Sequence, residues 1–223
     1  MSGLARTTAV YIVVALVVGL IVGAAIGRVT APAPTATPAA TPAPAVGLSG
    51  EIPIAALIPL TGELSTFGAQ YRVVAEEAVK EVNDWLASIG RQWRLKLIVE
   101  DTGTDPVKAL DKMRLLHAQG VKIFIGVASS GEVRQLKTYA DANKLLVISP
   151  SSTAADLALK DYVLRYTPND IIQGKAIAKI MWERGIRYVV PIWRGDTWGD
   201  GLKRDTEKSF MEICKASGER CGF

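Results

Sequence analysis

The stretches KIFIGVASSGEV (residues 122–133) and LLVISPSSTAADL (residues 145–157) decide the fold of this chain. In each stretch a short apolar run ends at small hydroxyl residues, and a segment of helix-forming composition follows. This pattern predicts two parallel strands, each leading into a helix. It places Ser130 and Thr153 at the carboxyl ends of the strands, beside the amino ends of the helices.

Ser130 and Thr153 are therefore candidates for an anion-binding site. The free N–H groups and the dipole at a helix amino end favour anions, and ligands of open parallel sheets bind at the carboxyl ends of the strands. Two such junctions close in sequence predict a pocket for a small molecule that carries a carboxylate. Ser and Thr are also ordinary helix N-caps, so the pattern alone leaves a purely structural role open.

The remainder of the folded part alternates strand-like with helix-like segments. Strands are expected at residues 52–58, 95–99, 122–125, 145–148, 162–165 and 188–193. Helices are expected at residues 69–87, 106–119, 131–143, 169–184 and 201–215. This alternation predicts an α/β fold, with a doubly wound and mostly parallel sheet covered by helices.

The amino-terminal residues have a different composition. Residues 1–28 contain an uncharged apolar run at 9–26, which as a helix would span about 27 Å, close to the bilayer core. We expect a transmembrane anchor, with a cleaved or uncleaved signal segment as the alternative. Residues 29–49, rich in Ala, Pro and Thr, are expected to form an extended stalk. Anchor and stalk together predict a folded domain outside the cell, tethered to the cell membrane.

Catalytic, metal and nucleic-acid functions find little support in the sequence. The net charge of +4 comes from scattered residues without a basic run, so no nucleic-acid partner is expected. The single histidine, His117, lies near the end of a predicted helix and is expected to be structural. The calcium-loop spacing from Asp196 to Glu207 is interrupted by Trp198. We expect no enzyme activity, no metal and no cofactor.

Six motifs occur in order along residues 51–223. They read IPLTGELSTFGAQYRVVAEEAVKEVN, LKLIVEDTGTDPVKAL, IFIGVASSGEV, ISPSSTAADL, YVLRYTPND and DTWGDGL. In this order the chain resembles the Leu/Ile/Val-type solute-binding proteins of ABC importers, which have the type I periplasmic-binding fold. The resemblance implies a two-lobed clamp around an amino acid, with ABC permease subunits as partners. Residues 50–167 would form lobe 1, and residues 168–223 the beginning of lobe 2.

The resemblance also implies roles for individual residues. Ser130 and Thr153 match the positions that hold the ligand carboxylate and ammonium. Ser151 matches a backbone carbonyl that accepts from the ammonium, and Ser152 lies between Ser151 and Thr153.

Two aromatic residues match positions on the walls of the cleft. Phe67 matches an aromatic in the first loop, and Trp198 matches one on the opposing lobe; both could equally be covering a core edge. Trp193 and Arg194, at the end of the last predicted strand, are candidates to face the cleft, but nothing in the sequence specifies a partner.

The length of the chain departs from the resemblance. Members of the family have a complete second lobe, and the acidic residue that clamps the ligand ammonium would lie beyond Phe223. We therefore expect an apparently truncated relative, whose residues 50–223 bind a ligand in the millimolar range or undetectably. Alternatives are an extracellular sensing domain of a receptor and a truncated relative that does not bind.

The two cysteines, Cys214 and Cys221, lie close together near the end of the chain. Outside the cell a disulfide between them would persist. Two buried free thiols are the alternative.

Overall fold

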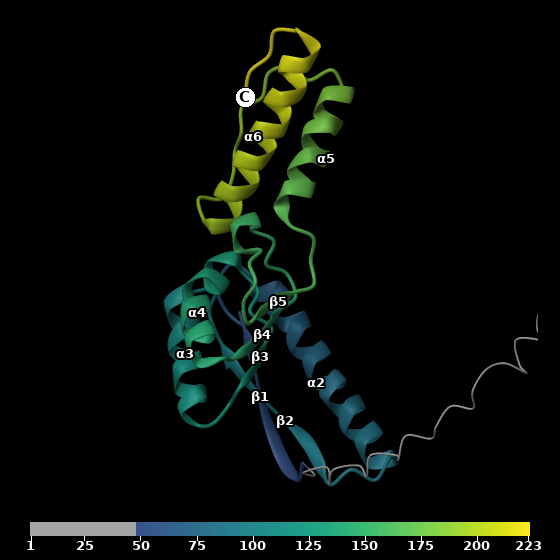
Figure 1. The fold of residues 1–223 in the computed structure, drawn as a ribbon, viewed down its shortest axis with the longest axis vertical. Helices are drawn as coiled ribbons and strands as arrows, with labels where there is room; N and C mark the ends of the chain where they lie inside the picture. The colour runs from purple at the N-terminus through teal and green to yellow at the C-terminus, as the bar shows by residue number, and fades with distance from the viewer. Residues whose placement is uncertain (1–47) are drawn as a thin grey trace, which may run out of the picture. The chain divides into compact units, whose positions relative to one another are not determined.

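In the computed structural model, which describes residues 48–223, five strands form one parallel sheet (Figure 1). The order across the sheet is β2-β1-β3-β4-β5. The strands are β1 (Gly50–Ile58), β2 (Trp93–Asp101), β3 (Ile123–Ile125), β4 (Leu146–Ser149) and β5 (Val163–Arg165). Every neighbouring pair is parallel, which confirms the predicted α/β class.

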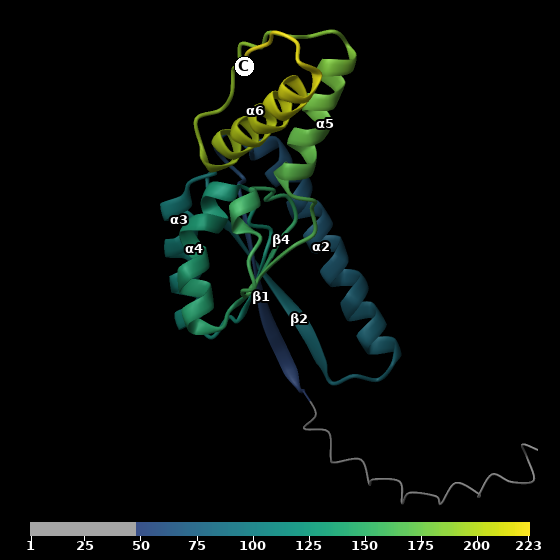
Figure 2. The same ribbon diagram turned by 45° about the horizontal axis from the view of Figure 1, so that its top comes forward.

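Helices cover both faces of this sheet. Helices α3 (Pro106–Ala118) and α4 (Ser130–Asn143) pack side by side on one face, and α2 (Ser65–Ser88) lies on the other, against β1 and β2 (Figure 2). The fully buried core lies between the sheet and the α3–α4 layer, where Phe124 and Leu136 are inaccessible to solvent. Successive strand residues point to opposite faces, so each strand supplies this core with every second side chain.

Local signals explain where α3 and α4 begin. The Asp105 carboxylate accepts from the backbone N–H groups of Val107 and Lys108 at 2.8 and 3.1 Å, with Pro106 at the first helical position as predicted. Helix α4 begins with a capping box between Ser129 and Glu132. The Ser129 hydroxyl accepts from the Glu132 N–H at 3.1 Å, and the Glu132 carboxylate accepts from the Ser129 N–H at 2.9 Å.

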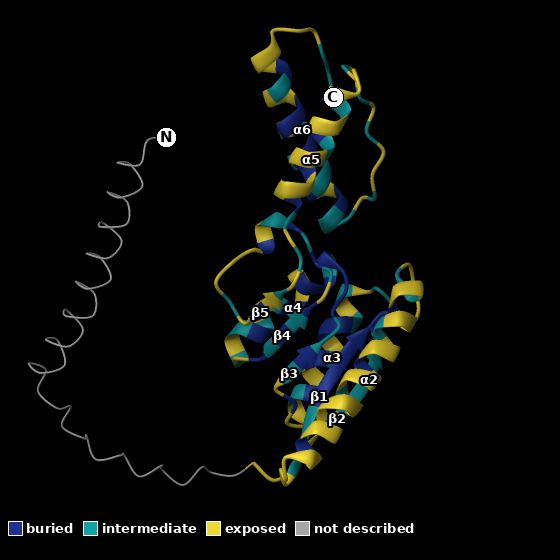
Figure 3. Ribbon diagram, turned by 90° about the vertical axis from the view of Figure 1, so that its right-hand side faces the viewer, coloured by how far each residue is buried: buried dark blue, intermediate teal, exposed yellow. Residues whose placement is uncertain are grey.

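After β5 the chain continues into two packed helices, α5 (Asp170–Glu183) and α6 (Thr197–Ser217) (Figure 3). The helices approach closely at Gly174, where a Cβ atom would lie 2.8 Å from the backbone of α6. Helix α6 begins four residues earlier than predicted, because the Asp196 carboxylate accepts from the Gly199 N–H at 2.8 Å and so caps the helix. The predicted lobe boundary at residues 167–168 falls in the connection between β5 and α5.

The strand predicted at residues 188–193 is wrong. In the described part of the chain this segment makes one isolated parallel bridge, between Tyr188 and Gly222, and Ile192 is 96% exposed. A strand persists only within a ladder, and Pro191 removes one of the donors that a ladder needs.

The α-helix predicted after Thr153 is also wrong. Only a single 3-10 turn, η1 (Ala155–Leu157), follows Thr153, and its N-cap Ala154 forms no side-chain cap. Because β5 begins at Val163, the chain must re-enter the sheet before an α-helix can propagate. Thr153 therefore lies in a loop, whereas Ser130 does occupy the first turn of an α-helix.

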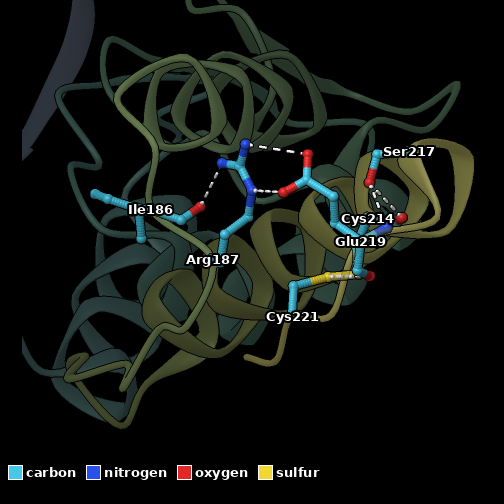
Figure 4. The surroundings of a disulfide bond; sticks show 6 residues. All are labelled: Ile186, Arg187, Cys214, Ser217, Glu219 and Cys221. Atoms are coloured by element: carbon cyan, nitrogen blue, oxygen red, sulfur yellow. Dashed lines mark hydrogen bonds and ion pairs between the residues drawn. A yellow bond between two sulfur atoms is a disulfide. The ribbon is translucent and has the colours of Figure 1, made fainter.

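The end of the described chain folds back along α6. Cys214 of α6 is joined to Cys221 by a disulfide, with the two Cα atoms 6.2 Å apart (Figure 4). Gly218 ends the helix in the left-handed conformation and reverses the chain. The Arg187 guanidinium pairs with the Glu219 carboxylate at 2.6 Å, which holds this turn beside the segment after α5.

The anchor predicted at residues 1–28 lies outside the described residues, as does nearly all of the stalk predicted at residues 29–49. Within residues 48–223, none of the helices has the length and apolar character needed to cross a membrane.

Candidate functional site

A pocket of about 400 Å³ lies at the carboxyl ends of β3 and β4. Five of the six predicted site residues line it, and they come from four separate segments: Phe67, Ser130, Ser151, Thr153 and Trp198. Ser152 does not line the pocket, because it is 1% exposed and lies behind the wall.

The start of α4 provides hydrogen-bond donors. Ser129, rather than Ser130, is the N-cap, and its own N–H is taken by the Glu132 carboxylate. The N–H groups of Ser130 and Gly131 make no hydrogen bond with any described residue. Two free amides at the positive end of a fourteen-residue helix are suited to accept an anionic group.

The hydroxyl of Ser130 connects the two strand-to-helix junctions. It lies 3.0 Å from the Ser152 hydroxyl and accepts from the Ala154 N–H at 3.3 Å. The Ser151 hydroxyl donates to the Ala128 carbonyl at 2.8 Å, which adds a second link between the loops. Through these bonds the Ser130 and Ser152 side chains hold the two loops in register, with Ser152 behind the wall of the pocket.

The loop after β4 provides acceptors. The Ser151 carbonyl makes no hydrogen bond with the described residues. The Thr153 hydroxyl is buried and likewise has no partner among them, whereas the Thr153 carbonyl accepts from the Asp170 N–H at 2.9 Å. A free carbonyl and a free hydroxyl suit a cationic donor such as an ammonium group.

Aromatic side chains face these polar groups. Phe67, Leu64 and Tyr71 line the pocket from the beginning of α2, and Trp198 lines it from the first turn of α6. The first turn of α2 approaches the loop after β1 so closely that a Cβ atom on Gly68 would lie 2.0 Å from the Pro59 carbonyl oxygen. This apolar wall suits the hydrocarbon part of a small ligand.

The loop between β1 and α2 is held by Asp101, at the end of β2. The Asp101 carboxylate accepts from the Thr61 N–H at 3.1 Å, the Thr61 hydroxyl at 2.7 Å, the Gly103 N–H at 2.8 Å and the Lys108 ammonium at 2.9 Å. Burial alone would raise the pKa of Asp101, but the hydrogen bonds from Lys108, Thr61 and Gly103 outweigh burial and hold that pKa well below its usual range. A charged Asp101 therefore fixes the loop that leads to Leu64.

Gln173 and Arg194 also line the pocket; nothing in the sequence indicated Gln173, whereas Arg194 was a candidate to face the cleft. Arg194 is the one charged residue that lines the pocket, and it pairs with Asp196 at 2.5 Å and with Glu63 at 3.6 Å. Only its position after an apolar run hinted at this location. No local signal marked Gln173, because its placement depends on how α5 leaves the sheet.

Residues that could suggest other chemistry lie elsewhere. The His117 ring nitrogens contact the Tyr139 hydroxyl and the Lys122 ammonium, each at 2.8 Å. Asp200 and Glu207 lie within α6, so they do not form a calcium loop. Across residues 48–223, no group of three or more His, Cys, Asp or Glu side chains could hold a metal ion.

A doubly wound parallel sheet with a polar and aromatic pocket at its carboxyl edge, faced by a second pair of helices, defines the class of type I periplasmic-binding folds. Comparison with family models gives the same answer. The model described as periplasmic binding protein matches residues 51–213, and the chain belongs to this family.

Individual relatives agree with this assignment. The chain is 40% identical over 174 residues to an uncharacterized protein of Methanocaldococcus jannaschii, covering 75% of this chain and 41% of the relative. It is 26% identical over 162 residues to the Leu/Ile/Val-binding protein of Escherichia coli, covering 71% and 44%. The solved leucine binding protein LivK of Thermotoga maritima has the same fold, with a TM-score of 0.64, 24% identity and coverage of 77% and 49%. The chain thus spans less than half the length of these relatives.

Proposed function

We propose that this chain is the extracytoplasmic substrate-binding component of an ABC importer and binds an amino acid of the branched-chain type, or a related small carboxylate. One observation carries the proposal. The pocket is lined by Ser130, whose amide is unbonded like that of the adjacent Gly131, and by Ser151 and Thr153, whose carbonyl and hydroxyl respectively are unbonded. This pairing of donors and acceptors matches the carboxylate and ammonium of an amino acid.

Each part of the ligand would contact a different group of residues in the pocket. The carboxylate would accept from the Ser130 and Gly131 amides, and the ammonium would donate to Ser151 and Thr153. The side chain would contact the rings of Phe67 and Trp198. Ser152 would act from behind, by holding the hydroxyl of Ser130.

The importer context rests on the family and on the printed names of relatives, which include a Leu/Ile/Val-binding protein and an ABC transporter substrate-binding protein. We infer ABC permease subunits as partners and a position outside the cell. Tethering by residues 1–28 is part of the same proposal. The matched regions cover half or less of those relatives, so the activity of the whole protein is included in what we propose.

Titration of the isotopically labelled chain with leucine, followed by NMR, tests the proposal. None of the lining residues is acidic, so the ammonium meets only neutral acceptors, and we expect a dissociation constant in the millimolar range. The amide signals of Ser130 and Gly131 should shift during the titration.

Isoamylamine is the matched control, because it keeps the leucine side chain and ammonium but lacks the carboxylate. It should bind more weakly than leucine and leave the α4 amides unshifted. Shifts confined to another part of the chain would show that the pocket is elsewhere. Silence toward all common amino acids and small carboxylates would refute the proposed function.

A further inference from the structure

Asp170 is a buried carboxyl group without a hydrogen-bond partner. The residue is 0% exposed, and neither carboxylate oxygen is bonded to any described residue. It is the first residue of α5, where the positive end of the helix favours a negative charge. Burial of an unpaired polar group is costly, so stability does not account for Asp170 at this position.

The position of Asp170 points to the pocket. Its N–H donates to the Thr153 carbonyl at 2.9 Å. Just before it, the Arg165 guanidinium donates to the Ala154 carbonyl at 2.7 Å and the Thr167 hydroxyl to the Ser152 carbonyl at 3.1 Å. The segment from β5 to α5 is therefore hydrogen-bonded to the loop after β4, which supplies the acceptors of the pocket.

The side chains complete this relationship. The Thr153 hydroxyl, like the Asp170 carboxylate, is buried without a partner. The Thr153 hydroxyl, the Trp198 indole and Arg165 all lie close enough to the Asp170 carboxylate to oppose the rise of its pKa on burial, and none of them forms a hydrogen bond with it in this structure. A hydroxyl has one proton and two acceptor positions, so Thr153 can donate to Asp170 while it accepts from a ligand.

We propose that Asp170 is a positioning residue of the ligand site: it orients the Thr153 hydroxyl toward the ligand and supplies, from behind the wall, the negative charge that the pocket lining lacks. The inference rests on the proposed function, because it concerns the ammonium group of the same ligand. It commits the site to ligands that carry a cationic amino group beside the carboxylate.

The buried carboxyl group of Asp170 should lower the free energy of unfolding of the protein. Burial raises the pKa of Asp170, and the negative charge of Asp205 on α6 raises it further; the Thr153 hydroxyl, the Trp198 indole and Arg165 oppose the rise. A residue kept for ligand binding, and not for folding, should be replaceable with a gain in stability and a loss of binding.

The experiment compares the wild-type chain with Asp170→Asn, which keeps the shape and removes the charge. The probes are leucine and isocaproate, its analogue without the amino group. The variant should bind leucine about fivefold to tenfold more weakly and isocaproate within about twofold of wild type. Its Tm at neutral pH should rise by about 3–6 °C.

A double-mutant cycle with Thr153→Val tests whether Asp170 acts through the hydroxyl. The effects of the two substitutions on leucine binding should be strongly non-additive. In the wild type, the carboxyl signal of Asp170 should titrate at lower pH when leucine is bound, and not when isocaproate is bound.

The possible failures are distinguishable. If the wild-type chain binds neither leucine nor isocaproate, the proposed function fails and this inference falls with it. If both bind but Asp170→Asn weakens them equally, or lowers Tm, Asp170 is only structural and this inference alone is overturned. Additive effects of Asp170→Asn and Thr153→Val would also overturn it, since the charge would then act without the hydroxyl.

Discussion

The backbone N–H of Asp170 donates a 2.9 Å hydrogen bond to the Thr153 carbonyl, so the first helix after the sheet begins against the wall of the pocket. Residues seventeen positions apart thereby couple the pocket to the start of the α5–α6 pair. A change in either residue should affect both stability and binding.

The stability of the wild type relative to Asp170→Asn should depend on pH. Burial raises the folded-state pKa of Asp170 above 3.8. Below pH 3.8 the carboxyl group is protonated in both the folded and the unfolded chain, so the wild type loses no stability there. As pH rises from 3.8 through the folded pKa, the wild type becomes progressively less stable. We expect the variant to be the more stable at about pH 8 and the two to converge near about pH 3. Thermal unfolding across this pH range measures the difference in Tm between the wild type and the variant. A difference that does not change with pH would contradict a raised pKa of Asp170.

Asp101→Asn should loosen the loop between β1 and α2. The carboxylate accepts from Thr61, Gly103 and Lys108, and loss of its charge should lower the free energy of unfolding by about 1–2 kcal/mol. The pKa of Asp101 is depressed, so its contribution is present above 3.8 and is lost as pH falls through the folded pKa. Urea unfolding measures the change; Asp84→Asn, at an exposed surface pair, is the control and should be nearly neutral.

Ser130→Ala should destabilise the junction between the two loops. It leaves the Ala154 N–H and the Ser152 hydroxyl without their buried partner, with an expected loss of about 1–3 kcal/mol. Thr66→Ala, at an exposed position of α2, is the matched control. Equal unfolding midpoints for both variants in urea would show that the hydroxyl pair is unimportant.

We expect Cys214 and Cys221 to be disulfide-bonded in solution. Closure of this short loop should contribute about 2 kcal/mol on a chain-entropy estimate. Reduction, or the double substitution Cys214→Ser/Cys221→Ser, should therefore lower Tm. Labelling of both cysteines by a thiol reagent under denaturing, non-reducing conditions would rule out the bridge.

The proposed membrane anchor predicts a particular outcome in cells. Protease added to intact cells should digest the chain after Gly50, while residues 1–28 stay in the membrane fraction. A cytoplasmic protein of the same cells serves as the control and should stay protected from the protease. Resistance of the folded part in intact cells, with digestion only after lysis, would contradict the proposed orientation.

Much of the fold could be read from local signals. The alternation of apolar runs with helical segments predicted the parallel sheet, and Asp105 followed by Pro106 marked the start of α3 because a cap depends on a few adjacent residues. The prediction failed at residues 188–193, because a strand depends on neighbours that an apolar run cannot specify.

The features of the pocket likewise fall into those that the sequence predicted and those that it did not. The sequence by itself determined the ends of β3 and β4 at polar residues and the start of α4 after β3, since these follow from composition and spacing, but it did not determine the loop that follows β4. Only the tertiary structure decided that Phe67 and Trp198 line one cavity, that Arg194 is its charged lining residue, and that Asp170 is buried behind Thr153. The physical reason is that burial and side-chain contacts arise between segments far apart in the chain, and their free energies depend on the packed surroundings, which no short stretch of residues contains.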